Sequence, residues 1–207
     1  LGGSPAAEFS LEARQVVLCL GPYTDLIGPK LAKDWNPRLS PSKGVHLVFD
    51  LKRLPLSGAV VMSHPDDGRI SFAIPRPDYG TGVLIVGTTD GPAPLDPEAA
   101  QVEKADIAYL LVLLGRYFPE AKLQHSDILS AYIGVRPLVA PEAGTEGRAS
   151  LQTVSREHHI EEGPGGVVWA AGGKYTTHRT MAADIVNAAL QAWGAAVERN
   201  EVEAVPV

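Results

Sequence analysis

One stretch near the end of the chain, residues 165–179, restricts the fold more than any other: GGVVWAAGGKYTTHR. Its apolar part, residues 167–171, is long enough for a buried strand and too short for a helix. Gly172 and Gly173 then allow a sharp turn, and the Thr-Thr pair that begins at Thr176 offers N-caps for a helix. The stretch therefore predicts a strand, a glycine turn and a helix.

The turn has two interpretations on these residues alone. A helix N-terminus leaves free N–H groups and the positive end of a dipole, and Lys174 adds a full charge, so the turn suits an anion or a polarised carbonyl. Alternatively, Gly172 and Gly173 only make a tight connection and Lys174 is solvated. The local pattern slightly favours the second interpretation, and both stay open.

Composition restricts the class of protein. The chain has 207 residues, 45% of them hydrophobic and 20% charged, which is enough for one large or two small globular domains. A net charge of −6 argues against nucleic-acid binding. The single cysteine, Cys19, excludes a disulfide within the chain and indicates a reducing compartment. No apolar run reaches the roughly 18 residues of a membrane span, and no Cys/His cluster has metal-ligand spacing.

The remaining patterns predict an α+β fold with a mixed, largely antiparallel sheet covered by helices. The apolar run Gln15–Leu20, which ends in Gly-Pro, predicts a strand buried on both faces. The Asp-Gly pair at Asp67 predicts a hairpin turn, and Asp96-Pro97 a helix start. Further strands are expected at Val45–Phe49, Ala59–Ser63, Ile70–Ile74, Gly82–Gly87, Asp127–Leu138 and Ser150–Arg156, and helices at Tyr23–Leu31 and from Asp96 to Phe118, with Glu103, Lys104 and Asp106 on the solvated side of the second.

Two polar residues stand inside predicted strands. His46 is either a hydrogen-bonded structural histidine, the commoner case, or a functional group. Arg136, between Val135 and Pro137, needs an anionic or carbonyl partner if it is buried. The alternative is an arginine at a strand end with its guanidinium in water.

Four motifs, in this order, carry a family resemblance: KGVHLV at residues 43–48, GTTD at 87–90, GVRPL at 134–138 and GGKYTTHR at 172–179. Together they resemble the second half of the FAD-dependent (aerobic, quinone-linked) glycerol-3-phosphate dehydrogenases, in the D-amino-acid-oxidase-like superfamily. The resemblance extends over about residues 14–190. The chain starts without Met, and the strand–GxGxxG–helix unit that holds the FAD pyrophosphate in this family is absent, so we expect a piece of a longer protein.

The resemblance implies a division into three segments. Residues 1–37 are expected to be part of the FAD-binding domain, 38–160 the substrate-binding sheet, and 161–207 the return strand and helix of a partial, Rossmann-like FAD-binding domain. The implied reaction is oxidation of sn-glycerol 3-phosphate to dihydroxyacetone phosphate, with FAD as hydride acceptor and quinone as electron acceptor. The resemblance implies a full-length protein that is cytoplasmic and peripheral on the inner face of the cell membrane, and it allows a homodimer.

The resemblance also implies roles for single residues. Arg136 matches the substrate-binding arginine and His46 the strand histidine near the substrate, a candidate base. Lys174 matches a lysine near flavin and substrate. The implied cofactor contacts are Gly172, Gly173, Lys174, Tyr175 and Thr176, with Gly21 near the adenosine end. Tyr175 and His178 depart from the Leu and Tyr of the family pattern, which leaves the roles of their side chains open.

Two alternatives remain beside this function. One is another FAD-dependent oxidase, acting on an amine or a 2-hydroxy acid, which would also use an arginine to hold an anion. The other is a non-catalytic module without cofactor, which the missing GxGxxG unit favours. For the chain by itself, we expect neither FAD retention nor turnover.

Overall fold

The computed structural model describes residues 10–31, 33–140, 157–163 and 166–194. They form two lobes, one around a six-stranded sheet and one around a three-stranded sheet. The predicted strand Ser150–Arg156 lies outside the described residues. The predicted α+β class with a largely antiparallel sheet is confirmed.

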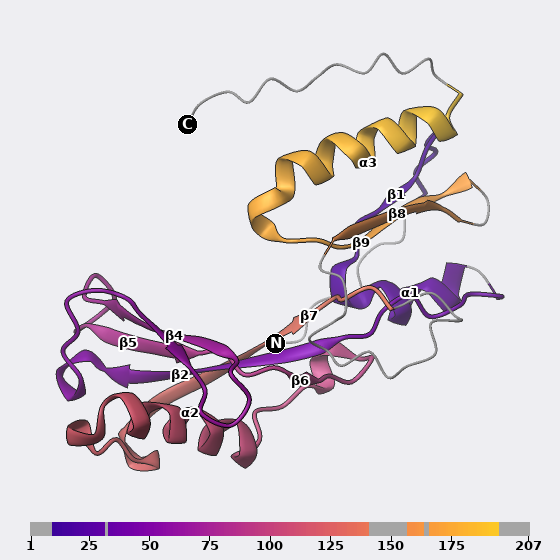
Figure 1. The fold of residues 1–207 in the computed structure, drawn as a ribbon. Coiled ribbons are helices and arrows are strands. Elements are labelled where there is room, and N and C mark those ends of the chain that lie inside the picture. The colour runs from indigo at the N-terminus through magenta and orange to yellow at the C-terminus, as the bar shows by residue number, and fades with distance from the viewer. Residues whose placement is uncertain (1–9, 32, 141–156, 164–165, 195–207) are drawn as a thin grey trace.

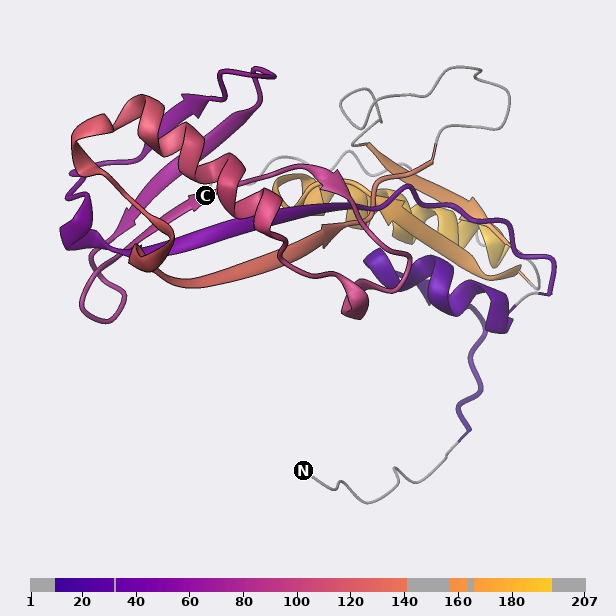
Figure 2. The ribbon, with the colours of Figure 1, turned by 90° about the horizontal axis from the view of Figure 1, so that it is seen from below.

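The larger sheet has the strand order β3-β4-β5-β2-β6, with β7 pairing the other edge of β2. Every pairing in it is antiparallel, and the hairpin predicted at the Asp67 turn is confirmed by the pairing of β3 with β4. Its two longest strands, β2 and β7, run side by side toward the smaller lobe (Figures 1 and 2). The bounds are β2 Ser42–Asp50, β3 Val60–Ser63, β4 Ile70–Arg76, β5 Val83–Gly87, β6 Gly91–Pro92 and β7 Ile128–Arg136.

The two faces of the larger sheet differ because side chains alternate along each strand. On β2, Val45, Leu47 and Phe49 are fully buried against helix α2, Lys104–Tyr117, which covers this face (Figure 1). Their neighbours at even positions, His46 among them, are on the opposite face, which α2 leaves uncovered. We call this opposite side the open face.

Helix α2 begins later than predicted. Asp96 caps only a short 3₁₀ turn, Pro97–Ala99, by accepting a hydrogen bond from the backbone of Glu98 at 3.0 Å. The helix itself starts at Lys104, where Asp106 accepts from the backbone N–H of Glu103 at 3.0 Å. The placement of Asp106 on the solvated side was therefore wrong: it is buried, because its carboxylate is the partner of a buried lysine, Lys43, at 2.9 Å.

The smaller sheet has the order β1-β9-β8, with β1 parallel and β8 antiparallel to β9. Strand β9, Val168–Gly172, confirms the predicted strand, and helix α3, His178–Ala192, follows it across the sheet (Figure 1). A strand, β1, is present at the apolar run after Gln15, but it is only Val17–Leu18 and borders the described sheet with Val17 38% exposed, so the predicted burial on both faces was wrong. Strand β8, His158–Glu162, was not predicted because its sequence is polar and adjoins a glycine-rich turn.

Helix α1, Thr24–Leu31, leads from the smaller lobe into β2. The carboxylate of Asp25 accepts from the indole N–H of Trp35 at 3.0 Å and from the backbone N–H of Leu39 at 2.8 Å. Leu39 and Trp169 are buried in one cluster, and Leu39 also bridges to Val139 just beyond β7. The two connections between the lobes are thus held together where they meet the smaller sheet.

Candidate active site

The open face carries His46 in a row of residues that crosses four strands. Strand register places Phe72, Gly87, His46 and Tyr132 opposite one another, from β4 to β7. The His46 ring stacks on Tyr132 with ring centres 4.8 Å apart and planes 5° apart. A Cβ at Gly87 would come within 2.7 Å of Cγ of His46, so the glycine leaves room for the imidazole.

His46 is partly buried, and among the described residues its ring nitrogens have no hydrogen-bond partner. Burial, and then the positive charge of Arg136, hold the pKa of His46 below its ordinary value. The imidazole is therefore neutral at neutral pH and has a nitrogen lone pair to accept a proton. The commoner fate of a strand histidine, a hydrogen-bonded structural role, is not seen in the described part of the chain.

Arg136 lies at the end of β7, where its guanidinium has the anionic and carbonyl partners that its position required. The loop Thr88–Asp90, which we call the rim loop, supplies most of them. Arg136 donates to Thr88 Oγ1 at 2.9 Å, the Lys43 carbonyl at 3.0 Å, Ser42 Oγ at 3.1 Å, the Thr89 carbonyl at 3.2 Å and Asp90 Oδ1 at 3.3 Å. The arginine thus joins β7, β2 and the rim loop.

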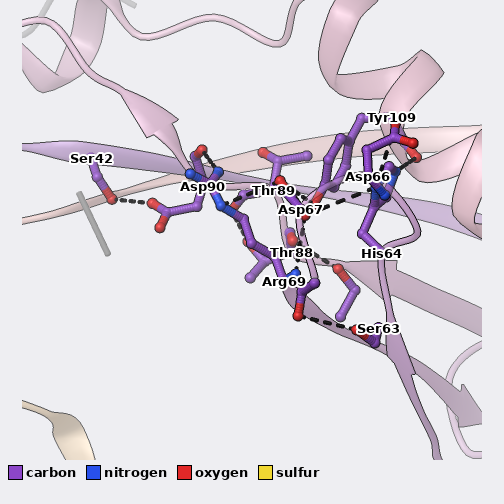
Figure 3. Close-up of polar contacts among 12 residues, drawn as sticks. Ser42, Ser63, His64, Asp66, Asp67, Arg69, Thr88, Thr89, Asp90 and Tyr109 are labelled. Carbon is purple, nitrogen blue, oxygen red and sulfur yellow. Dashed lines mark hydrogen bonds and ion pairs between the residues drawn. The ribbon is translucent and has the colours of Figure 1, made fainter. Parts of the chain in front are cut away.

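A glycine leaves room for this guanidinium, and side-chain hydrogen bonds hold the rim loop on both faces of the sheet. A Cβ at Gly44 would come within 2.8 Å of Cζ of Arg136. On the α2 side, Thr89 donates to Asp106 at 3.2 Å and accepts from the backbone of Val45 at 3.0 Å. On the open face, Ser42 Oγ donates to Asp90 Oδ1 at 2.9 Å (Figure 3). The side chains of the loop therefore alternate between the core and the open face.

A pocket of about 580 Å³ opens beside the rim loop on the open face. It brings together two guanidinium groups, a hydroxyl, two carboxylates and an apolar wall. It is lined by Asp67, Gly68, Arg69, Ile70, Phe72, Thr88, Asp90 and Arg136. His46 is not among these residues, but it lies in one row with Phe72 across the bare backbone of Gly87. The sequence did not single out Arg69; its signal was the position directly after the Asp-Gly hairpin turn.

The glycines of the turn after β9 have close neighbours within the chain itself. Gly172 and Gly173 have φ of +74° and +81°. A Cβ at Gly172 would come within 2.6 Å of the Glu157 carbonyl, and one at Gly173 within 2.6 Å of Cε of Met181. Both residues must therefore be glycine for the packing of the smaller lobe, whatever else approaches the turn.

The residues after these glycines face solvent. Lys174 is exposed, Tyr175 is 90% exposed, and Thr176 is exposed too. The following 3₁₀ turn, Tyr175–Thr177, leads directly into α3, and no side chain caps either start, which leaves backbone N–H groups for another partner. The predicted caps at the two threonines are therefore not made: Thr177 Oγ1 donates to the Lys174 carbonyl at 3.0 Å instead.

The predicted site residues fall into two groups. His46 and Arg136 share the open face of the larger sheet, close enough for the charge of one to act on the other. Lys174 and its turn belong to the smaller lobe, between β9 and α3. No contact between Lys174 and either His46 or Arg136 is found in the described parts of the chain. Gly21 has φ of +53° at the start of the 3₁₀ turn Gly21–Tyr23, and a Cβ there would meet nothing within 4 Å.

Comparison with known families identifies the larger group to which this architecture belongs. Residues 3–199 match the family described as FAD dependent oxidoreductase. The chain belongs to this family. The chain is 34% identical over 185 residues to the mitochondrial glycerol-3-phosphate dehydrogenase of Macaca fascicularis, covering 89% of the chain and 24% of the relative. It is 35% identical over 179 residues to the aerobic glycerol-3-phosphate dehydrogenase of Staphylococcus haemolyticus, covering 86% and 30%.

Solved structures show the same relationship. The glycerol-3-phosphate dehydrogenase of Bacillus halodurans, solved in complex with FAD, matches with a TM-score of 0.71 and 32% identity, over 90% of this chain and 34% of that one. Glycine oxidase from Geobacillus kaustophilus shares the fold, with a TM-score of 0.50 and 15% identity, over 91% and 44% of the two chains. The chain thus spans about a quarter to a third of the length of the curated dehydrogenases it matches.

Two further classes of feature are absent from the described residues. Within them, no group of three or more His, Cys, Asp or Glu side chains is arranged to hold a metal ion. No helix in the described ranges has both the length and the apolar character needed to cross a bilayer.

Proposed function

We propose that the protein carrying this chain oxidises sn-glycerol 3-phosphate to dihydroxyacetone phosphate, and that the open face of the larger sheet is the substrate side of the active site. The observation that carries the proposal is that His46, whose pKa is lowered, shares one sheet face with a pocket lined by two arginines, Arg69 and Arg136. The relatives named glycerol-3-phosphate dehydrogenase support the choice of substrate.

Oxidation of the secondary alcohol requires loss of a hydride from C2 and of the hydroxyl proton. FAD, when bound, accepts the hydride. His46 accepts the proton at its unprotonated ring nitrogen, because burial and the nearby Arg136 charge keep that nitrogen free at neutral pH. The stacked Tyr132 ring fixes the plane of the imidazole.

Arg136 supplies the positive charge that a phosphate or a developing carbonyl oxygen needs. Its shorter bonds, from 2.9 to 3.1 Å, tie it to Thr88, Lys43 and Ser42. The longest of its bonds to described residues, 3.3 Å to Asp90, is the one that a substrate oxygen can replace at low cost, because Asp90 keeps its bond from Ser42. The arginine therefore binds substrate without releasing the strand it anchors.

The turn after β9 fits a flavin at its polar edge. Uncapped N–H groups, an exposed lysine and positive-φ glycines occur together there, which suits negative charge on a reduced flavin. We assign this contact to Gly172, Gly173, Lys174, Tyr175 and Thr176, and the adenosine end to Gly21. The parallel β1–β9 pair with α3 supports the proposal that residues 1–37 and 161–207 belong to a Rossmann-like FAD-binding domain around the substrate sheet of residues 38–160.

The setting of the full-length protein is a proposal that rests on the family resemblance. It comprises quinone as the electron acceptor, a cytoplasmic position on the inner face of the membrane by peripheral attachment, and a homodimer. The word "aerobic" in the name of the Staphylococcus haemolyticus relative supports respiratory electron transfer.

Turnover by the FAD-loaded, full-length protein tests the function. We expect glycerol 3-phosphate to be oxidised with a kcat/KM far above that for glycine, D-alanine or lactate. Comparable kcat/KM for an amino acid or a 2-hydroxy acid would contradict the proposal and support the alternative class of flavin oxidase.

A further inference from the structure

We infer that Arg69 is a second anion-binding residue of the pocket, and that together with Arg136 it selects a small phosphorylated polyol over a carboxylate substrate. The inference deepens the proposed function and rests on it for the identity of the polyol. Arg69 follows the turn between β3 and β4, and its guanidinium lines the pocket with that of Arg136. A phosphate dianion suits two cations, whereas a carboxylate needs one.

Both arginines bond to Asp90 of the rim loop, through different groups of that residue. Arg69 Nη1 donates to the backbone carbonyl of Asp90, and Arg136 donates to the carboxylate of the same residue at 3.3 Å (Figure 3 shows the Arg69 side). In the same loop, the Thr88 carbonyl accepts a hydrogen bond from Ser71 Oγ at 2.9 Å. The positions of the two guanidinium groups are therefore fixed relative to one another before any ligand arrives.

The two arginines differ in the donors they have left. Both Nη nitrogens of Arg136 donate to the protein, and five of these bonds go to described residues. In the described part of the chain, Arg69 Nη2 donates to nothing, and its Nε approaches Asp67 only at 3.5 Å. Because a guanidinium carries five N–H donors, Arg69 has donors to spare for an anion, while Arg136 contributes mainly charge.

A network behind Arg69 anchors it to helix α2. Asp67 Oδ1 accepts from the Arg69 backbone N–H and from the Tyr109 hydroxyl, each at 3.0 Å, and the Tyr109 ring stacks on buried His64 at 3.7 Å (Figure 3). Burial raises the pKa of Asp67, but hydrogen bonds from Arg69 and Tyr109 outweigh it and keep the pKa below its usual value. Burial and Asp67 raise the pKa of Tyr109 to about 12, so its hydroxyl remains a donor. A preorganised arginine costs less entropy on binding.

The carboxylate of Asp90 adds selectivity for a polyol. Its Oδ1 accepts from Ser42 and Arg136, while within the described residues its Oδ2 accepts no bond. An unoccupied carboxylate oxygen can accept a hydrogen bond from a substrate hydroxyl. The pocket therefore suits a molecule that carries both a phosphate and a free hydroxyl.

Inorganic phosphate is the probe, titrated into the full-length, FAD-loaded protein and monitored by calorimetry and by competitive inhibition. We expect Arg69→Gln to raise the phosphate Kd and the KM for glycerol 3-phosphate about 10- to 100-fold, the effect of one charge-assisted hydrogen bond, with little change in kcat. The matched control is Arg116→Gln, an exposed arginine of the neighbouring pocket at Ser63, His64 and Tyr117, which should change neither constant.

An unchanged phosphate Kd in folded Arg69→Gln would overturn the inference. If that variant has a lowered Tm, Ile70→Glu carries the test, because Ile70 lines the pocket, is 49% exposed and tolerates a charge. Phosphate binding that survives this added charge would also overturn it. A third outcome is that Arg69→Gln weakens phosphate binding but the wild-type protein does not oxidise glycerol 3-phosphate. That result would support the anion site and contradict only the proposed reaction.

Discussion

Arg136 Nη2 donates to Thr88 Oγ1 at 2.9 Å, so the arginine of β7 holds a loop that follows β5, on the other side of β2. One side chain thus gives the pocket a positive charge and also supports its wall. Its replacement should affect both the chemistry and the shape of the pocket.

For Arg136→Ala in the full-length protein, we expect kcat/KM for glycerol 3-phosphate to fall about 100-fold or more, as for loss of a preorganised donor, with the flavin absorption band retained. The control is Arg76→Ala, an exposed arginine of β4 that pairs with Asp78 at 2.8 Å. A near-normal kcat/KM for Arg136→Ala would remove this residue from the site.

The pKa of His46 predicts a pH dependence of catalysis. Since the base must be neutral, kcat/KM should fall on the acidic side with an apparent pKa below the ordinary histidine value of about 6.5. Arg136→Gln removes a neighbouring positive charge, so the acidic limb should move upward but stay below that value, because burial remains. An acidic limb that does not move would show that another group titrates.

The same histidine affects stability with pH. Its folded-state pKa is lowered, so the stability it contributes is present above the unfolded value of about 6.5 and is lost as pH falls through the folded value. Between pH 7 and 5, Tm of the wild type should therefore drop more than Tm of His46→Phe. Thermal unfolding followed by circular dichroism measures this difference, and equal slopes would contradict it.

Two glycines that pair across β2 and β7, Gly44 and Gly134, offer a matched comparison. A Cβ at Gly44 would meet the guanidinium of Arg136, with Cζ at 2.8 Å, whereas one at Gly134 would meet nothing within 4 Å. We expect Gly44→Ala to lower the free energy of unfolding by about 1–3 kcal/mol through overpacking, and Gly134→Ala to change it by less than about 0.5 kcal/mol. Urea titrations of both variants test this, and equal losses would refute it.

The ion pair of Lys43 and Asp106 lies under the rim loop, with side chains 8% and 11% exposed. Burial lowers the pKa of Lys43, but hydrogen bonds to Asp106 and Glu103 outweigh it and leave the pKa raised. We expect Lys43→Met to cost about 3–5 kcal/mol of unfolding free energy, because a buried carboxylate loses its partner. Adding Asp106→Asn should recover part of the loss, measured by chemical denaturation. The exposed pair Arg53–Asp127, at 2.8 Å, is the control and should give a much smaller effect.

Much of the larger sheet could be predicted because its strands are short apolar runs between clear turn signals, as at Ile70–Arg76. The partners of Arg136 could be predicted in kind, since a cation between Val135 and Pro137 needs oxygen atoms around it. Their identity could not, because Thr88 and Asp90 reach the arginine only through sheet pairing about 50 residues away in sequence, as their separations of 48 and 46 show.

The features that the sequence did not predict also have physical explanations. Asp106 has the polar character of a solvated helix residue, and only the tertiary fold places Lys43 beside it. Arg69 occupies an ordinary hairpin position, and its pocket exists only once β4 lies beside the rim loop. Strand β8 is polar because β9 supplies the buried side of that sheet, so no alternation marks it.

The alternation along β2 has a consequence for how this protein can change. Val45, Leu47 and Phe49 pack on the α2 side, while Gly44 and His46 lie on the open face, the proposed substrate side. One strand of nine residues therefore carries two alternating sets of side chains that are nearly independent of each other. Substitutions at the even-numbered positions of β2 can therefore change substrate preference, while the odd-numbered positions keep the domain folded.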